Sequence, residues 1–260
     1  MEELSTLTGL IPCLVKAITL GVYLLSSANC QHSKVSIRSE GLKTFKFGID
    51  LRLVRSNIDY GNFAIYDQLN KEVIIDKNEG RIVFIGNSIT QGWKNFMPEM
   101  FDNQTFINRG ISGQTSTEML VRFRTDVINL KPKVVVILAG TNDIAGNTLF
   151  RGLEIVAGNI SSMAELASQN NIKVILCSVL PAANFPWRQG KNPDIKIPLL
   201  NGLIKDYAKK KGFYYLDYYN LMNDGNNGLK KDYGNDGVHP NLNGYILMQK
   251  MVLDAISNIL

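Results

Sequence analysis

Histidine and cysteine are scarce in this sequence, and each shortage excludes a class of protein. The 260 residues contain three cysteines, Cys13, Cys30 and Cys177, which cannot form a disulfide framework. Only two histidines occur, His32 and His239, so a metal site built mainly from imidazole ligands is excluded. We therefore expect neither a bound metal nor a cofactor.

Charge is not concentrated in any part of the chain. The 28 Lys and Arg and the 23 Asp and Glu give a net charge of +5. The lysines are spread along the chain and form no basic stripe, so we predict no nucleic-acid partner. A hydrophobic content of 45% is that of an ordinary globular protein, not of a disordered one.

Several motifs that identify other enzyme classes are also absent. No Gly-x-Gly-x-x-Gly follows the first predicted strand, which argues against a dinucleotide site. No P-loop and no His-Glu-x-x-His occurs. A Gly-x-Ser-x-Gly elbow around Ser88 is excluded because residue 90 is threonine rather than glycine.

Residues 1–29 differ from the remainder and have the composition of a leader. An uncharged, mostly apolar run spans residues 17–25, and small residues follow it, which is typical of a signal peptide cleaved after Ala28. The run is too short for a membrane span. Acidic residues 2 and 3 stand where positive charge is usual, so an uncleaved anchor or a misassigned start is the alternative.

Cys30 offers a second interpretation of the leader, in which it becomes the lipidated first residue of a surface lipoprotein. Asn29 is a poor residue directly before such a cysteine. Either interpretation predicts export to the periplasm, the extracellular space or the cell envelope, and a lipid anchor at Cys30 is the one membrane attachment we consider. Cys177 lies in an apolar strand pattern, which predicts a buried and inert thiol.

The pattern of apolar residues predicts an α/β fold over residues 57–260, after a short extension over residues 30–56 in which we expect one extended piece over residues 32–56. Stretches with helical spacing alternate with short apolar runs, so we expect a parallel sheet with helices on both faces and right-handed crossovers. A further helix is expected within residues 57–75. The five predicted strands are Arg81–Gly86, Gln104–Asn108, Lys133–Ala139, Ile172–Val179 and Phe213–Asp217.

Helix boundaries are marked by local signals. Thr115 and Glu118 form a capping box at the start of one helix. Three lysines and then Gly212 end another, which suits the negative end of a helix dipole and a left-handed cap. The expected core stripes of the remaining helices include Leu153, Val156, Ala157, Ile160, Met163, Ala164 and Ala167, then Leu200, Leu203, Ile204, Tyr207 and Ala208, and finally Met248, Met251, Val252, Ala255, Ile256 and Ile259.

Polar residues follow the first three predicted strands. They occupy residues 86–90, 108–110 and 140–143, and a further polar group at residues 236–240 precedes the last helix. Ligands of open parallel sheets bind outside the carboxyl ends of the strands. In a flavodoxin-like strand order the first three strands are neighbours, so we expect these loops to converge.

Ser88 and His239 are candidates for a nucleophile and its base. A serine hydroxyl needs an adjacent base, and histidine is the usual base near neutral pH. His32 lies beside the predicted cleavage point, so His239 is the remaining histidine that could serve as the base. Asp236, three residues earlier, can turn back to hold the imidazole. Taken singly, Ser88 suits an N-cap and Asp236 suits a turn, and these alternatives remain open at this stage.

Acyl transfer also needs donors that stabilise an oxyanion. The backbone N–H of Ser88, the backbone N–H of Gly110 and the side-chain amide of Asn142 are the candidates. Alone, Gly110 suits a turn and Asn142 suits a loop cap. Their predicted place on one edge of the sheet favours the catalytic interpretation.

These four polar segments, in this order, resemble the sequence blocks of the SGNH/GDSL family of serine ester hydrolases. The resemblance spans roughly residues 57–260, and its four naming residues fall on Ser88, Gly110, Asn142 and His239, with Asp236 completing a triad. It implies a three-layer α/β/α sandwich with a five-stranded parallel sheet, and hydrolysis of carboxylic esters. Asn87 stands where the family usually has aspartate.

The loop after the fourth predicted strand supplies candidate pocket residues. Phe185, Trp187 and Arg188 are expected to wall a substrate pocket, with Asn87 beside them, although loop packing explains the first three equally well. This arrangement resembles platelet-activating-factor acetylhydrolases and bacterial acetylesterases. The absence of a long apolar lid favours a short acyl group, such as acetyl on a carbohydrate. The alternatives are a lysophospholipase or thioesterase and a non-catalytic carbohydrate-binding protein.

Overall fold

A computed structural model describes residues 59–75, 80–102 and 105–260, so the predicted leader, Cys30 and the predicted extended piece at residues 32–56 lie outside the described residues. Five parallel strands form one sheet in the order β2-β1-β3-β4-β5, which confirms the α/β prediction and the adjacency of the first three strands. The strands are β1 (Ile82–Gly86), β2 (Phe106–Gly110), β3 (Val134–Leu138), β4 (Lys173–Cys177) and β5 (Tyr214–Leu216).

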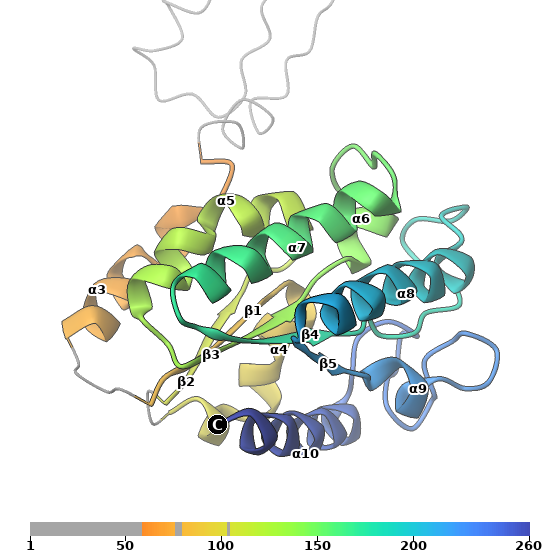
Figure 1. The fold of residues 1–260 in the computed structure, drawn as a ribbon. Coiled ribbons are helices and arrows are strands. Elements are labelled where there is room, and N and C mark those ends of the chain that lie inside the picture. Colours follow the sequence, from red (N-terminus) through yellow and green to blue (C-terminus); the bar gives the residue numbers. More distant parts are fainter. Residues whose placement is uncertain (1–58, 76–79, 103–104) are drawn as a thin grey trace, which may run out of the picture. The chain divides into compact units, whose positions relative to one another are not determined.

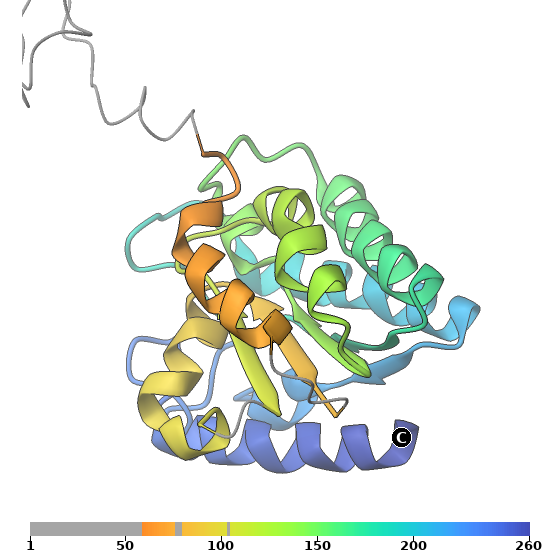
Figure 2. The same ribbon diagram turned by 90° about the vertical axis from the view of Figure 1, so that its left-hand side faces the viewer.

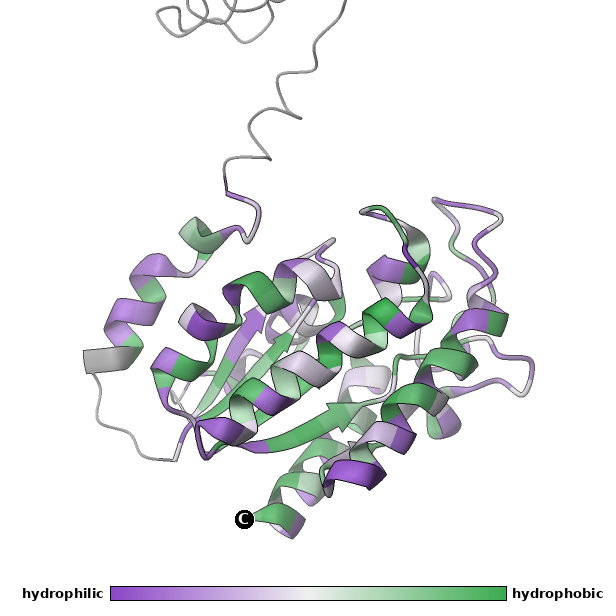
Figure 3. Cartoon of the chain, turned by 45° about the horizontal axis from the view of Figure 1, so that its top comes forward, coloured by the Kyte–Doolittle hydropathy of each residue, from purple (hydrophilic) through white to green (hydrophobic). Residues whose placement is uncertain are grey.

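Helices cover both faces of the sheet, as Figures 1 and 2 show. Apart from the polar end of β2, the strands are mostly apolar (Figure 3). The side chains of β1 alternate between two buried clusters: Val83 and Ile85 face one, Ile82 and Phe84 the other. The first cluster is completed mainly by helices α5 (Ser116–Asp126), α7 (Leu153–Gln169) and α8 (Pro193–Lys211), and the second mainly by α4 (Ser88–Phe96) and α10 (Leu242–Ile259).

Short elements fill the connections. The helix expected within residues 57–75 is α3 (Asp67–Ile75), preceded by the single turn η1 (Phe63–Ile65). The other short elements are η2 (Pro98–Met100), η3 (Ile128–Leu130), α6 (Thr141–Ala145) and α9 (Tyr218–Met222). Within the described residues, no helix is both long and apolar enough to span a membrane.

The local helix signals are confirmed. The backbone N–H of Thr115 donates to the Glu118 carboxylate at 2.8 Å, which completes the capping box of α5. Gly212 ends α8 at a φ of +73°, directly after its three lysines. Burial raises the pKa of the Cys177 thiol, so this side chain is inert as predicted.

Two predictions about the elements were wrong. The second strand begins at Phe106 and continues through Gly110, so Arg109 and Gly110 pair with β1 instead of following the strand. The sequence pattern does not indicate a strand that ends in polar residues. The buried contacts that hold Arg109 there include Asn70, which is distant in the chain. Leu203, expected in the core stripe of α8, is 38% exposed.

Candidate active site

Ser88, His239 and Asp236 form a connected chain of hydrogen bonds. Ser88 is the first residue of α4, two residues after the end of β1, and its Oγ lies 3.0 Å from His239 Nε2. The other ring nitrogen of His239, Nδ1, lies 2.7 Å from Asp236 Oδ2. This is the geometry in which an imidazole takes a proton from a hydroxyl while a carboxylate fixes its tautomer.

The turn from Asp236 to His239 orients the imidazole locally. Asp236 Oδ1 accepts the backbone N–H of Val238 at 2.9 Å and of His239 at 2.7 Å, while Oδ2 remains for the imidazole. Gly237 between them has a φ of +78°, which a residue with a side chain rarely adopts. Burial by itself would raise the pKa of Asp236, but the hydrogen bonds from His239 and Val238 outweigh it and lower the pKa. The carboxylate therefore stays ionised at neutral pH.

Asn87 stabilises the turn between β1 and α4 that carries Ser88. Its side chain is 1% exposed, and its Oδ1 accepts the backbone N–H of Ile89 at 3.0 Å, so it caps α4. The structure thus places Asn87 inside the protein and not on a pocket wall. Because asparagine supplies the same acceptor oxygen as aspartate, the cap is retained.

Gly110 is not placed as an oxyanion donor. Its backbone N–H donates to Asn108 Oδ1 at 2.9 Å and therefore has its acceptor within the protein. A side chain at Gly110 would collide with the backbone of Gln91 in α4, so the glycine permits close packing of β2 on this helix. The predicted role of the Gly110 N–H as an oxyanion donor is therefore wrong, because this N–H already has an acceptor.

Gly113, which the sequence pattern does not single out, has the properties expected of that donor. It lies in the turn between β2 and α5 with a φ of +81°, and space around it is nearly open. Asn147 Nδ2 donates to its carbonyl at 2.9 Å, whereas its N–H has no hydrogen-bond acceptor among the described residues. The signal in the sequence was a second glycine three residues after the first.

Asn142 lies at the start of α6, directly after β3. Its Nδ2 donates one hydrogen to the backbone carbonyl of Gln114 at 3.0 Å, and the side chain is buried. An amide nitrogen carries two hydrogens, so one remains for a ligand oxygen. The backbone N–H of Ser88, in the first turn of α4, likewise has no partner within its helix.

The three predicted pocket residues of the loop after β4 have different positions. Trp187 is 48% exposed, and its ring centroid lies 5.9 Å from that of His239. Phe185 is fully buried and stacks against Trp187 at 5.4 Å, so it supports the exposed ring. Arg188 donates to the carbonyls of Ala145 and Gly146, at the end of α6. Only Trp187 of this group is seen directly beside the triad.

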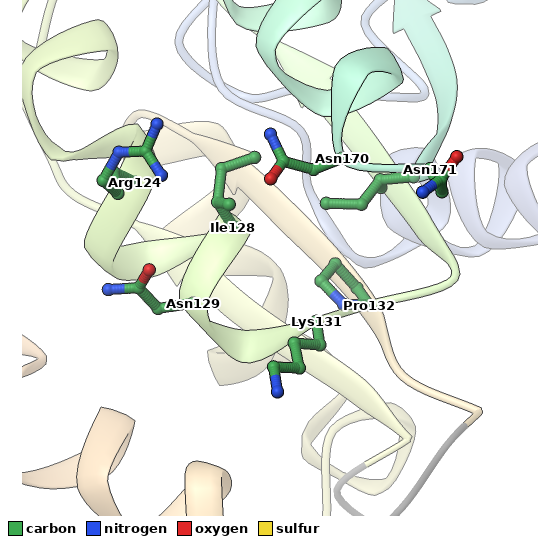
Figure 4. A pocket seen from close by; sticks show the side chains of 8 residues that line it. Arg124, Ile128, Asn129, Lys131, Pro132, Asn170 and Asn171 are labelled. Carbon is green, nitrogen blue, oxygen red and sulfur yellow. The ribbon is translucent and has the colours of Figure 1, made fainter.

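A hollow of about 710 Å³ lies away from these residues (Figure 4). Pro132 precedes β3 and Ile172 precedes β4, and both line the hollow, so it is at the amino ends of the strands. The triad and the open donors are at the carboxyl ends, where parallel sheets bind ligands.

Within the described residues no cluster of His, Cys, Asp and Glu suits a metal ion.

Comparison with known proteins gives a consistent family. The model of the GDSL-like lipase/acylhydrolase family matches residues 84–247. A crystal structure of a GDSL-like lipase from Bacteroides thetaiotaomicron is 48% identical with a TM-score of 0.74, and the match covers 77% of this chain and all of that one.

Curated relatives match over shorter segments. The human platelet-activating factor acetylhydrolase IB subunit alpha2 is 31% identical over 125 residues, which are 46% of this chain and 52% of the relative. An uncharacterized lipoprotein of Bacillus subtilis is 37% identical over 84 residues, 30% of this chain and 34% of the relative. The chain thus spans about half the length, or less, of these curated relatives.

Proposed function

The chain belongs to the GDSL-like lipase/acylhydrolase family, and from this premise we propose that it hydrolyses carboxylic esters through an acyl-enzyme on Ser88. One observation carries the proposal: the Oγ of Ser88 lies 3.0 Å from His239, which is itself held by Asp236. A binding protein would have no use for a hydroxyl, an imidazole and an ionised carboxylate aligned in this order.

In the first half of the reaction, Ser88 Oγ attacks the ester carbonyl while His239 Nε2 accepts its proton. The imidazolium is stabilised by Asp236 and then protonates the leaving alcohol, which departs and leaves the acyl group on Ser88. In the second half, His239 removes a proton from a water that attacks the acyl-enzyme. The same imidazolium returns a proton to Ser88 as the acid is released.

The negative oxygen that forms in both halves needs donors fixed in advance. We assign this role to the backbone N–H of Ser88, the backbone N–H of Gly113 and the free hydrogen of the Asn142 amide. All three lie in the segments that follow the carboxyl ends of β1, β2 and β3, which are adjacent in the sheet: Ser88 and Asn142 in the first turns of α4 and α6, and Gly113 in the turn before α5. None of these three hydrogens is used by another acceptor among the described residues.

We further propose that the substrate is a short acyl ester, most simply an acetyl ester on a carbohydrate. The matching human relative is by name an acetylhydrolase, which supports the acyl part. Trp187 supports the alcohol part, because a half-exposed aromatic face beside His239 can stack on the apolar face of a sugar ring. A lysophospholipase or thioesterase acting on longer chains is the alternative.

A series of aryl esters from acetyl to decanoyl distinguishes these substrates. We expect kcat/KM to be highest for acetyl and at least about tenfold lower for the octanoyl ester, because a single misplaced methylene is already worth about 10–200-fold. Release of acetate from an acetylated oligosaccharide tests the alcohol part directly. A kcat/KM that rises steadily with chain length would replace the short-chain proposal with the longer-chain alternative.

We propose a location at the cell envelope, because the Bacillus subtilis relative is described as a lipoprotein and Cys30 follows the leader pattern. If Cys30 is lipidated, the full-length protein is expected to sediment with membranes, and Cys30→Ser is expected to release it to the soluble fraction. A soluble wild-type product that begins at Asn29 would contradict the lipid anchor at Cys30 and would support export with ordinary cleavage of the leader.

A further inference from the structure

A fully buried guanidinium lies directly beneath the active site. Arg122 of α5 is 0% exposed, and its Nη2 donates to the carbonyls of Gly86 at 3.2 Å and Arg109 at 2.8 Å. Gly86 ends β1 one residue before the nucleophile turn, and Arg109 is the penultimate residue of β2. One side chain therefore holds together the ends of the two strands that lead to the site.

The same guanidinium holds the turn after β2. Arg122 Nε donates to Gln114 Oε1 at 2.6 Å, and Gln114 Nε2 donates to the carbonyl of Gly61 at 3.0 Å. Gln114 is 2% exposed, and its backbone carbonyl accepts the Asn142 amide. Gln114 also follows Gly113 directly. Its side chain is thus anchored to Arg122 while its backbone adjoins two of the assigned oxyanion donors.

Stability alone is a poor explanation for this arrangement. Arg122 pairs with Asp126 at 2.8 Å, and both side chains are almost completely buried. Burying an ion pair costs desolvation free energy that its attraction often only offsets, so apolar residues of similar volume would serve a core equally well. Each nitrogen of the Arg122 guanidinium has a hydrogen-bond partner, and side chains joined in this way are held in one geometry.

We propose that Gln114, held by Arg122, is a positioning residue for the oxyanion donors Gly113 and Asn142. This inference rests on the proposed ester hydrolysis and adds a role to residues outside the triad. Other contacts fix the same turn: Ser112 N–H donates to Gln91 Oε1 at 2.7 Å. Side chains of α4, α5 and α6 are therefore all hydrogen-bonded to this turn. The contact with α5 is the buried hydrogen bond between Arg122 and Gln114.

Gln114→Met tests the proposal, because methionine keeps the volume and removes both polar groups. We expect kcat to fall roughly 10–100-fold, the order that follows from a displacement of about 1 Å in a catalytic group. KM is expected to change less than about twofold, because the donors act mainly in the transition state. Gln114→Glu keeps an oxygen for Arg122 Nε and is expected to recover much of the lost kcat.

A double-mutant cycle with Asn142→Ala separates positioning from general damage. If Gln114 acts through this amide, Gln114→Met is expected to lower kcat less in the Asn142→Ala background than in the wild type. Equal losses in both backgrounds, with kcat of Gln114→Glu no higher than that of Gln114→Met, would overturn the proposal.

Asn70 provides the matched control. Its buried amide bridges Arg109 at 2.9 Å and Asp126 at 2.7 Å in the same network, but no hydrogen bond joins it to the 111–115 turn. Asn70→Leu is expected to lower the melting temperature as Gln114→Met does and to leave kcat unchanged. An equal loss of kcat in both variants would show that Gln114→Met lowers kcat through general destabilisation of the buried network, and the positioning role would be wrong.

Two further outcomes keep the failures distinguishable. If Ser88→Ala retains turnover, the proposed function itself fails. If Ser88→Ala is inactive and folded Gln114→Met keeps wild-type kcat, ester hydrolysis stands and the positioning role is wrong. If Gln114→Met does not fold, Gln114→Asn replaces it, since the shorter amide cannot reach Arg122 from the same backbone, and wild-type kcat in that variant would also overturn the proposal.

Discussion

Replacing Ser88 with alanine is expected to lower kcat by about 10⁶-fold, the order found when the nucleophile of a serine triad is removed. The hydroxyl forms the acyl-enzyme, and no other side chain in the described part of the chain is hydrogen-bonded to His239 Nε2. The fold should survive, because Ser88 is partly exposed and, among the residues that the structure describes, its side chain is hydrogen-bonded only to this ring. Steady-state hydrolysis of an aryl acetate and a thermal melt measure the two effects.

Ser168→Ala is a suitable control, because Ser168 is an exposed serine of α7 far along the chain from the triad. It is expected to keep wild-type turnover in the same preparation. A folded Ser88→Ala protein with turnover near that of Ser168→Ala would remove Ser88 as the nucleophile. Background hydrolysis by contaminants would be equal in the two preparations and is thereby subtracted.

Replacing Asn142 with alanine is expected to lower kcat by about 10²–10³-fold, or roughly 3–4 kcal/mol of transition-state stabilisation. The amide contacts the carbonyl oxygen most strongly once that oxygen is negative, so KM should remain nearly unchanged where it approximates binding. Ser88, His239 and Asp236 are still in place, and turnover should stay above that of Ser88→Ala. The measurement is steady-state kinetics on an activated acetyl ester.

Asn170 serves as the comparison for this variant. Its amide donates to the carbonyl of Leu166 at 2.7 Å in an exposed position at the end of α7, so it only caps a helix. Asn170→Ala is expected to affect the melting temperature slightly and turnover not at all. If Asn142→Ala behaves in the same way, with a lower melting temperature and intact turnover, its amide is structural and the oxyanion is bound by backbone donors alone.

The triad could be predicted because its residues are constrained by chemistry and by scarcity. Two histidines exist, and one of them is three residues after an aspartate, a spacing that a tight turn brings together. Ser88 follows a strongly apolar run, so its place at the carboxyl end of a strand followed from hydrophobic pattern alone. The distance between Ser88 and His239 could not be predicted, since it depends on how α10 packs against α4.

The oxyanion role proposed for Gly113 could not be predicted, because the end of β2 is not visible in the local sequence pattern. Because Arg109 is polar, the local pattern ends this strand at Asn108 and leaves Gly110 in the following loop. In the fold its guanidinium contacts Asn70, the carbonyl of Asn108 and the ring of Tyr66, so the strand continues. Buried polar partners from distant segments are invisible to a local pattern.

The pocket residues show the same limit. The sequence places aromatic residues in the loop after β4, but it does not tell which ring faces solvent. Phe185 is buried beneath Trp187, and this order depends on contacts of the loop with the finished core. The cap of α4 is a local feature, but the sequence pattern suggested Ser88 for it and a pocket wall for Asn87, whereas Asn87 is the N-cap.

Ser88 and His239 are in hydrogen-bond contact but 151 residues apart in the chain, and this separation sets the order in which they emerge during synthesis. A growing chain completes Ser88, Gly113 and Asn142 long before the ribosome reaches Asp236 and His239. Tyr245, near the start of α10, then donates to the carbonyl of Ile89 at 2.8 Å and fastens the late segment to the nucleophile helix. Under the proposed function, a nascent chain therefore carries an unactivated Ser88 until Asp236 and His239 have been synthesised and α10 has packed against α4.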